Sequence, residues 1–131
     1  MKPVEIVAIS LAFLAIWLTV LSVRVSQLRL RHRVSFGDGG HRDLLAAMRA
    51  HGNTLEQTAL YGLLALGCAA LPAASTEGLL VCALTFGVAR VLHAAGIFGR
   101  KLALRQLSHI ATVMVQLSLV GLMGRALWSM P

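Results

Sequence analysis

The sequence is 131 residues long, 57% hydrophobic and only 13% charged, with a mean hydropathy of +0.77. A chain this apolar cannot cover an ordinary soluble domain with polar surface, so the composition predicts one membrane domain over residues 1–131. The net charge of +7 would suit nucleic acid, but the basic residues lie in short connections with few aromatic residues between them. That pattern is typical of membrane topology and argues against a nucleic-acid partner.

Four apolar segments predict an all-α integral membrane protein, a bundle of four transmembrane helices in the lipid bilayer. The predicted spans cover approximately residues 4–23, 54–71, 78–97 and 106–124. The first has about 20 nearly uninterrupted apolar positions, enough to cross the ~30 Å hydrocarbon core. Lys2 is the only basic residue before this segment, and no small-residue cleavage site follows it. We therefore expect the segment to be retained and not removed as a signal peptide.

Glycine and proline mark the predicted helix ends. The glycines of residues 37–40 interrupt the helix and allow a tight turn. They do not form a phosphate loop, because no Lys-Ser/Thr pair follows them. A new helix is expected from His41 and is ended by Pro72. Ser75 or Thr76 can cap the next helix, and the short linker makes the second and third spans antiparallel neighbours.

The positions of lysine and arginine orient the bundle. The connection after the first span holds Arg24, Arg29, Arg31, Arg33 and Arg42, and the connection after the third holds Arg100, Lys101 and Arg105. The ends of the chain carry only Lys2 and Arg125. Because cytoplasmic connections carry an excess of Lys and Arg, we expect both basic connections in the cytoplasm. Both termini would then face the periplasm or lumen.

Polar side chains interrupt the apolar segments near the basic connections. They form three sets: Arg49, Asn53 and Glu56; Arg90 and His93; and Arg105, His109, Thr112 and Gln116. At about 100° per residue, each set falls on one face of its helix. A carboxylate in lipid needs a cation, and Arg90 is the only basic residue inside another apolar segment. We therefore expect an ion pair between Glu56 and Arg90.

Two interpretations of these residues stay open. In one, they are hydrogen bonds between helices that hold the bundle together, each worth about 1 kcal/mol or less in membranes. In the other, they form a polar ligand site open to the cytoplasm, in which the arginines bind carboxylates or thiolates. The sequence has no Ser/His/Asp set in a plausible order and no metal-binding spacing such as HExxH or CxxC. Cys68 and Cys82 lie in apolar runs and are interpreted as core or lipid-facing residues.

Three short motifs carry a family resemblance. RAHGNTLE at residues 49–56, ARVLHA at residues 89–94 and the later Arg105 resemble the MAPEG family, the membrane-associated proteins in eicosanoid and glutathione metabolism. The four spans and RVSFGDGG at residues 33–40 are similar to the small bacterial members. The resemblance covers nearly the whole chain. It implies a homotrimer of four-helix subunits, with glutathione as the cofactor bound between neighbouring subunits near the cytoplasmic face.

The resemblance also implies roles for individual residues. The cofactor-binding residues would be Arg49, Asn53, Glu56, Arg90 and His93, with Arg90 supporting Glu56. The candidate catalytic residues would be Arg105, which would face the thiol and stabilise the thiolate, and His109. Ile97 stands where well-studied members often carry tyrosine, and His109 stands near a position that is tyrosine in some of them.

The implied function is a glutathione-dependent transferase or peroxidase acting on a lipophilic small-molecule substrate that arrives from the lipid. The alternative is a non-catalytic membrane bundle, either a small transporter or a structural protein, that retains the fold. A proton-coupled exporter needs a carboxylate that exchanges partners, so an ion pair between Glu56 and Arg90 would argue against it. Glutathione binding would distinguish the two hypotheses.

The arginine distribution makes a prediction about topology. Reporter fusions should place residues 24–42 and 98–105 in the cytoplasm and both termini in the periplasm, because Lys and Arg are retained on the cytoplasmic side. A periplasmic signal from either basic connection would contradict this orientation.

Overall fold

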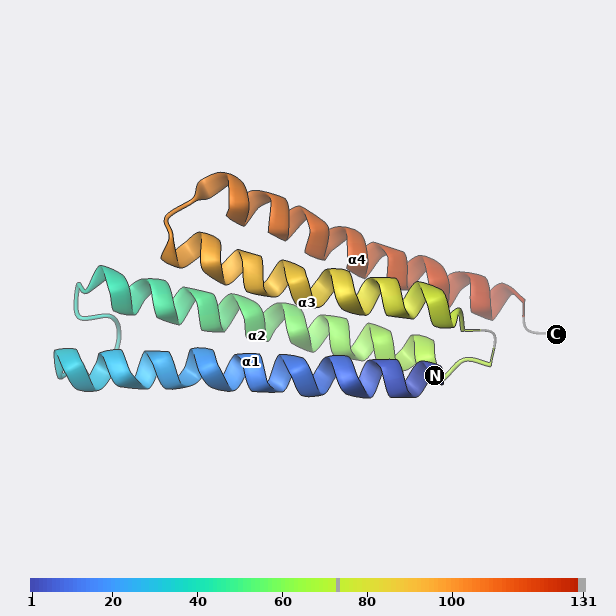
Figure 1. Cartoon of the computed structure of the whole chain (residues 1–131), viewed down its shortest axis with the longest axis horizontal. Helices are drawn as coiled ribbons and strands as arrows, with labels where there is room; N and C mark the ends of the chain where they lie inside the picture. Colours follow the sequence, from blue (N-terminus) through green and yellow to red (C-terminus); the bar gives the residue numbers. More distant parts are fainter. Residues whose placement is uncertain (73, 130–131) are drawn as a thin grey trace.

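The computed structural model describes residues 1–72 and 74–129 of the chain, and four α-helices account for most of them. They are α1 (Pro3–His32), α2 (Arg42–Ala69), α3 (Thr76–Phe98) and α4 (Leu102–Trp128). Successive helices run in opposite directions along one long axis (Figure 1). α1 packs against α2 and α3, while α4 packs against α3 and α2. The predicted all-helical fold with four helices is confirmed.

Three of these helices are long and apolar enough to cross a membrane, namely α1, α3 and α4. α2 is not among them, although it contains the predicted span 54–71 and lies alongside the others (Figure 1). The reason is local, because Asn53, Glu56 and Gln57 place polar groups in the middle of α2. One helix of the bundle is therefore too polar along one face to meet lipid on all sides.

α1 continues through much of the basic segment that we expected to be a connection. Arg24, Arg29 and Arg31 lie in its final turns, and the helix ends only at His32. Arginine, leucine and glutamine are good helix formers, so the charges did not stop the helix. Basic side chains also interact favourably with the partial negative charge at a helix C-terminus. Arg33 closes the helix in the left-handed conformation, with φ of 53°.

The predicted turns and caps fall where the sequence placed them. Gly37, Gly39 and Gly40 all have positive φ, at 65°, 56° and 79°, a region that glycine enters without steric cost. Of the two candidate caps for α3, Ser75 is the one used: its hydroxyl oxygen accepts a hydrogen bond from the Gly78 N–H at 3.1 Å. α2 ends shortly before Pro72.

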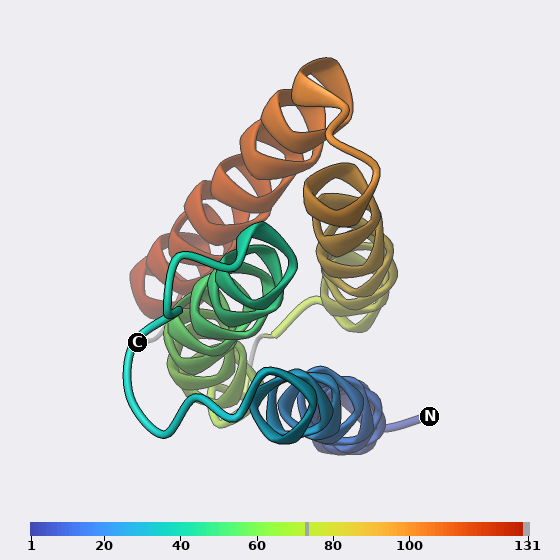
Figure 2. The ribbon, with the colours of Figure 1, turned by 90° about the vertical axis from the view of Figure 1, so that its left-hand side faces the viewer.

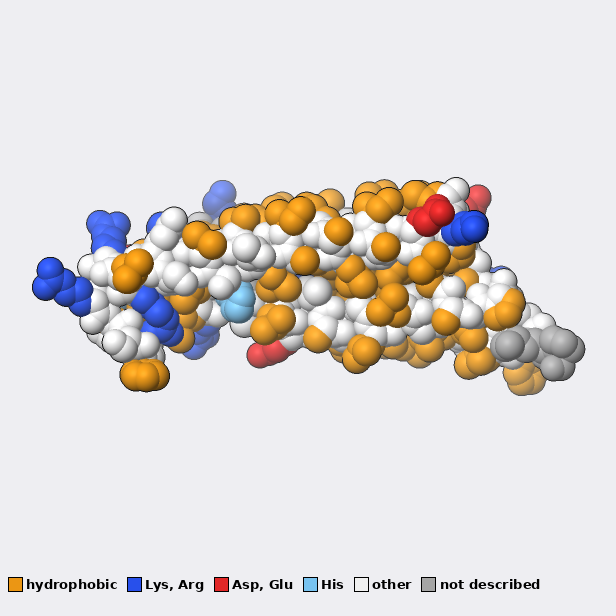
Figure 3. Space-filling model, turned by 90° about the horizontal axis from the view of Figure 1, so that it is seen from below, with side chains coloured by type: hydrophobic (Ala, Val, Ile, Leu, Met, Phe, Trp, Pro, Cys, Tyr) orange, Lys and Arg blue, Asp and Glu red, His pale blue; other side chains and the backbone are white. Residues whose placement is uncertain are grey.

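The two ends of the bundle differ in charge. The α1–α2 and α3–α4 connections lie together at one end, and the start of α1 and the end of α4 lie at the other (Figure 1). Arg and Lys side chains gather at the first of these, called the basic end below, while hydrophobic side chains cover the middle (Figure 3). This is the distribution that a membrane bundle needs, with an apolar belt between polar ends.

The main core lies toward the end of the bundle opposite the basic end, and all four helices contribute side chains to it. It includes Ile6, Val7, Leu14, Tyr61, Ala65, Cys68, Leu79, Cys82, Phe86, Val115 and Leu119. The Tyr61 ring stacks on Phe86 with centroids 4.1 Å apart, and its hydroxyl lies 3.0 Å from the Ser10 hydroxyl. Toward the basic end, α4 diverges from α2 while it stays beside α3 (Figures 1 and 2).

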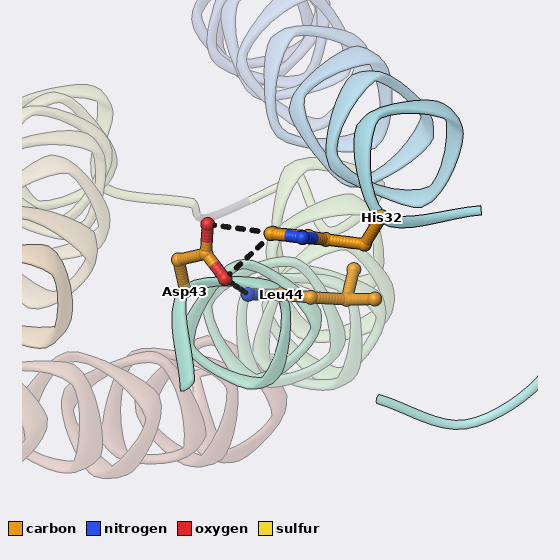
Figure 4. Close-up of polar contacts among 3 residues, drawn as sticks. All are labelled: His32, Asp43 and Leu44. Carbon is orange, nitrogen blue, oxygen red and sulfur yellow. Dashed lines mark hydrogen bonds and ion pairs between the residues drawn. The ribbon is translucent and has the colours of Figure 1, made fainter. Parts of the chain in front are cut away.

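A histidine and a carboxylate join α1 to α2 at the basic end (Figure 4). His32 Nε2 lies 3.0 and 2.9 Å from the two Asp43 oxygens, and Asp43 Oδ1 also accepts a hydrogen bond from the Leu44 N–H at 2.9 Å. The His32 ring stacks on His41, with centroids 3.9 Å apart. The hydrogen bond from His32 lowers the pKa of Asp43 below its ordinary value. The pair fixes the start of α2 against the end of α1.

This pair predicts a pH dependence of stability. Because the pKa of Asp43 is lower in the folded chain, its stabilising effect is present above the unfolded pKa near 3.8 and is lost as the pH falls through the folded pKa. Asp43→Asn should therefore melt at a lower temperature than wild type near neutral pH, with the gap closing in acid. The control is Asp38→Asn, which changes a nearby carboxylate that forms no ion pair with any described residue. A constant gap at every pH would exclude this linkage.

Candidate functional site

A cleft of about 620 Å³ opens at the basic end between α2, α3 and α4. It is lined by Leu45, Met48, Arg49, Gly52, Asn53 and Glu56 of α2, by His93 and Ile97 of α3, and by Leu102, Arg105, Gln106 and His109 of α4. It lies at the end of the bundle where α4 diverges from α2 (Figures 1 and 2). Its size falls within the range of about 300–1,000 Å³ that is usual for small-molecule sites.

The cleft brings together polar residues from all three predicted sets. Arg49, Asn53, Glu56, His93, Arg105 and His109 all line it, and only Arg90 of the predicted site residues lies behind its wall. Arg49, Glu56 and His109 are exposed, Asn53 and Arg105 are half-buried, and His93 is buried. The structure thus places these side chains around one space, while their roles toward a ligand stay predictions.

Arg90 is fully buried and connects α3 to both neighbouring helices. Its Nη1 donates to Asn53 Oδ1 at 2.9 Å, and its Nη2 donates to the Thr112 hydroxyl and, at 3.4 Å, to the Ser108 carbonyl oxygen. The guanidinium carbon lies 5.6 Å from the centroid of the Phe86 ring, within reach of a cation–π interaction. Every one of these partners is neutral, so dipoles and an aromatic face stabilise the buried cation.

The predicted ion pair between Glu56 and Arg90 is wrong for this chain. Over residues 1–72 and 74–129, the only ion pair is His32 with Asp43, and Glu56 is exposed on the wall of the cleft. The reason is the register of α2. Asn53 faces α3 and takes the guanidinium, and Glu56 lies about 60° away around the helix, toward the open cleft. The Glu56 carboxylate is consequently directed to the cleft and not to Arg90.

His93 is held by the start of α4. Its Nδ1 lies 3.3 Å from the Arg105 carbonyl oxygen and 3.4 Å from the Ser108 hydroxyl. A carbonyl oxygen only accepts hydrogen bonds, so Nδ1 donates in this contact and Nε2 is left as the acceptor of the ring. The His109 ring lies 6.3 Å from the His93 ring, centroid to centroid. The α4 wall therefore fixes the tautomer of a cleft side chain on α3.

Ser108 and Gly96 hold this wall of the cleft in place, and the sequence analysis singled out neither residue. Ser108 is buried, and its hydroxyl donates to the Leu104 carbonyl oxygen at 2.7 Å while its own carbonyl oxygen accepts from Arg90. Gly96 allows α4 to approach α3, because an added Cβ would lie 2.8 Å from Arg105 Cγ and 3.0 Å from the Arg105 nitrogen. For Gly96, the sequence offered one signal, an isolated glycine inside a predicted helix. Nothing in the sequence distinguished Ser108.

The predicted stripe on α4 divides into two parts. Arg105 and His109 line the cleft, whereas Thr112 and Gln116 are buried. Thr112 binds Arg90, and Gln116 Nε2 donates to Gln57 Oε1 of α2 at 2.9 Å. Thr112 and Gln116 therefore act as hydrogen-bonding residues between helices. Arg105 and His109 lie where a ligand site was predicted.

The charges of the cleft favour a ligand with charges of both signs. Arg49 on the α2 wall and Arg105 on the α4 wall provide two guanidiniums, and Glu56 provides one carboxylate. The Arg105 Nε is buried and has no hydrogen-bond partner within the described residues. Among those same residues, no group of three or more His, Cys, Asp or Glu side chains is placed to hold a metal ion. The cleft offers recognition of anions and of an amine.

Comparison with known proteins adds the family. The model of the MAPEG family matches residues 7–125, a range that contains every residue of the cleft. The inner membrane protein YecN of Escherichia coli strain K12 and its namesake in Escherichia coli O6:H1 strain CFT073 are each 32% identical over 117 residues, 89% of this chain and 86% of theirs. No solved structure matches the chain significantly.

The contact at Gly96 generates a prediction about stability. Gly96→Ala should push the first turn of α4 away from α3 and cost about 1–3 kcal/mol, the usual range for overpacking. Gly121→Ala in α4 is the matched control, because an added Cβ there meets nothing within 4 Å. It should be neutral or stabilising by up to about 1 kcal/mol, since alanine is the better helix former. Thermal unfolding in detergent measures both, and equal effects would contradict the close approach.

Proposed function

Because the chain belongs to the MAPEG family, we propose that it is an integral inner membrane protein that binds glutathione in the cleft between α2, α3 and α4. In this proposal it is a glutathione-dependent transferase or peroxidase for lipophilic electrophiles. The observation that carries it is the convergence of Arg49, Glu56 and Arg105 from two walls on one cleft. Such an arrangement suits a small peptide that carries carboxylates, an amine and a thiol.

The binding roles follow from hydrogen-bonding capacity. Arg49 can grip a glutathione carboxylate through two parallel N–H groups. Asn53 gives its oxygen to Arg90, which leaves its NH₂ group to donate to a ligand carboxylate. Glu56, which does not pair with Arg90, can accept hydrogen bonds from the glutathione ammonium group. His93 supplies an acceptor through Nε2, since its Nδ1 is engaged by α4.

The chemistry proposed for Arg105 is stabilisation of the glutathione thiolate. A guanidinium is always charged, and a cation beside a thiol favours its ionised form. Each unit by which the thiol pKa falls is worth about 1.4 kcal/mol. The thiolate then attacks an electrophilic carbon and expels the leaving group. Alternatively it attacks the terminal oxygen of a hydroperoxide, which breaks the O–O bond, leaves glutathione sulfenic acid and releases the alkoxide to be protonated to the alcohol. A second glutathione then converts the sulfenic acid to the disulfide and water. No protein nucleophile is needed, and His109, one turn from Arg105, is placed to protonate the leaving group.

The proposal includes a homotrimer in which a neighbouring subunit closes the cleft. The support comes from α2, because it is the helix that does not qualify as an apolar span and it exposes Arg49 and Glu56. Polar side chains in a membrane protein face protein or water and not lipid. Crosslinking in mild detergent should give a trimer. A monodisperse monomer that still binds glutathione would exclude the shared site.

One observation keeps the non-catalytic alternative in view. An exporter needs a carboxylate able to exchange partners, and Glu56 is exposed and not paired with Arg90. Because Glu56 forms no ion pair with Arg90, the predicted pair can no longer be used as an argument against a small transporter. Equilibrium dialysis with millimolar glutathione separates the two functions, and absence of binding would favour the bundle without thiol chemistry.

Conjugation of glutathione to chlorodinitrobenzene tests the role of Arg105. If the Arg105 guanidinium lowers the pKa of the glutathione thiol by one unit, Arg105→Ala should lower the conjugation rate about tenfold. The variant should also show a weaker ultraviolet absorbance of bound thiolate. Reduction of cumene hydroperoxide should fall in parallel. Arg125→Ala, at the opposite end of α4, is the control and should behave as wild type. Activity that survives Arg105→Ala with unchanged thiolate absorbance would leave Arg105 with a binding role alone.

A further inference from the structure

A second cleft, of about 500 Å³, lies at the basic end between α1, α2, the end of α3 and the α3–α4 connection. The residues used below are Trp17, Leu21, Arg24, Arg42, Phe98 and Arg100, all of which line it. It shares only Ile97 with the cleft assigned to glutathione. The two spaces therefore lie on different sides of α3 and need separate explanations.

Three guanidiniums from three parts of the chain meet at the second cleft. Arg24 comes from α1, Arg42 from the first turn of α2, and Arg100 from the α3–α4 connection. All three are exposed, and within the described residues their side chains make no hydrogen bond or ion pair. The one carboxylate in the cleft is Asp43, and His32 already engages it. The positive helix dipole at the start of α2 adds to the excess of positive charge.

The deeper part of the cleft is apolar and contains one unsatisfied donor. Leu21 is buried, and Phe98 and Trp17 contribute aromatic surface. The Trp17 Nε1 is buried and has no hydrogen-bond partner among the described residues, although a buried indole N–H ordinarily has one. Trp17 precedes Arg24 by about two turns of α1, or about 10 Å along the helix axis. The cleft thus changes from cationic at its mouth to apolar at its depth.

We propose that this second cleft binds an anionic phospholipid of the leaflet at the basic end. The lipid phosphate lies among Arg24, Arg42 and Arg100, and the glycerol and ester groups lie along Leu21 and Phe98. The Trp17 N–H donates to an ester carbonyl oxygen, and an acyl chain continues from there toward the apolar middle of the bundle. Basic pockets between helices at the membrane interface are suited to anionic headgroups, and tryptophan is enriched at that depth. A soluble phosphate would satisfy the arginines but would leave the apolar wall and the buried N–H unused.

Tryptophan fluorescence gives a direct assay. The chain has two tryptophans, Trp17 and Trp128, so Trp128→Phe leaves Trp17 as the sole reporter. In neutral detergent, added phosphatidylglycerol should shift the Trp17 emission with saturation, whereas phosphatidylcholine should not. Arg24→Gln/Arg100→Gln in this background should weaken apparent affinity for phosphatidylglycerol about tenfold or more. Arg31→Gln/Arg33→Gln, which removes equal charge at the same end outside the cleft, is the matched control and should retain binding.

Three results would overturn the proposal. Equal weakening in the two double variants would show attraction to general surface charge. Saturation by inorganic phosphate with the same emission shift would assign the cleft to a soluble anion. An equal response to phosphatidylcholine would show non-specific contact with lipid. Melting temperature and far-ultraviolet circular dichroism check that each variant folds. If the double variant Arg24→Gln/Arg100→Gln does not fold, Arg24→Gln alone replaces it, and we expect a smaller loss of affinity for phosphatidylglycerol.

Discussion

The buried guanidinium of Arg90 is the constraint on which the arrangement of α2, α3 and α4 depends. It sits on α3, and its donors reach Asn53 of α2 and Thr112 and Ser108 of α4. A cation taken out of water costs several kcal/mol unless hydrogen bonds compensate, and the Arg90 Nε already lacks a partner among the described residues. Sliding either neighbouring helix along α3 would break the remaining hydrogen bonds and add to this cost. The register fixed at this point decides which side chains line the cleft.

The bundle combines a closed half with an open half. Stacking of Tyr61 on Phe86 and the aliphatic core close the half that contains the start of α1 and the end of α4. In the other half, Gly96 permits the start of α4 to lie against α3, so α4 leaves α2 there. The cleft is therefore a product of helix packing, with its polar groups on rigid helices and not on loops. Such placement holds a site in a defined geometry.

Local patterns in the sequence predicted what local physics decides. The helices were predicted from the apolar runs, the glycines of the turn at 37–40 and the Ser75 cap. Helical periodicity predicted that the polar residues of each helix share one face, and most of them line the cleft. The partner of Arg90 was missed, because periodicity gives an angle around a helix and not the identity of the neighbour it meets. Asn53 and Glu56 are only about 60° apart. The close approach at Gly96, which the sequence signalled only as an isolated glycine inside a helix, depends on tertiary packing. So does the Trp17 N–H, which has no hydrogen-bond partner among the described residues.

The position of the partners of Arg90 also bears on how the chain enters the bilayer. An arginine within an apolar helix costs about 2.5–3.5 kcal/mol on insertion scales, and α3 alone offers it no acceptor. Two of its acceptors belong to α4, which follows after the short turn at residues 99–101. During synthesis Asn53 of α2 is already available to Arg90, but the Ser108 and Thr112 acceptors become available only once α4 has emerged, which favours insertion of α3 and α4 together as a hairpin.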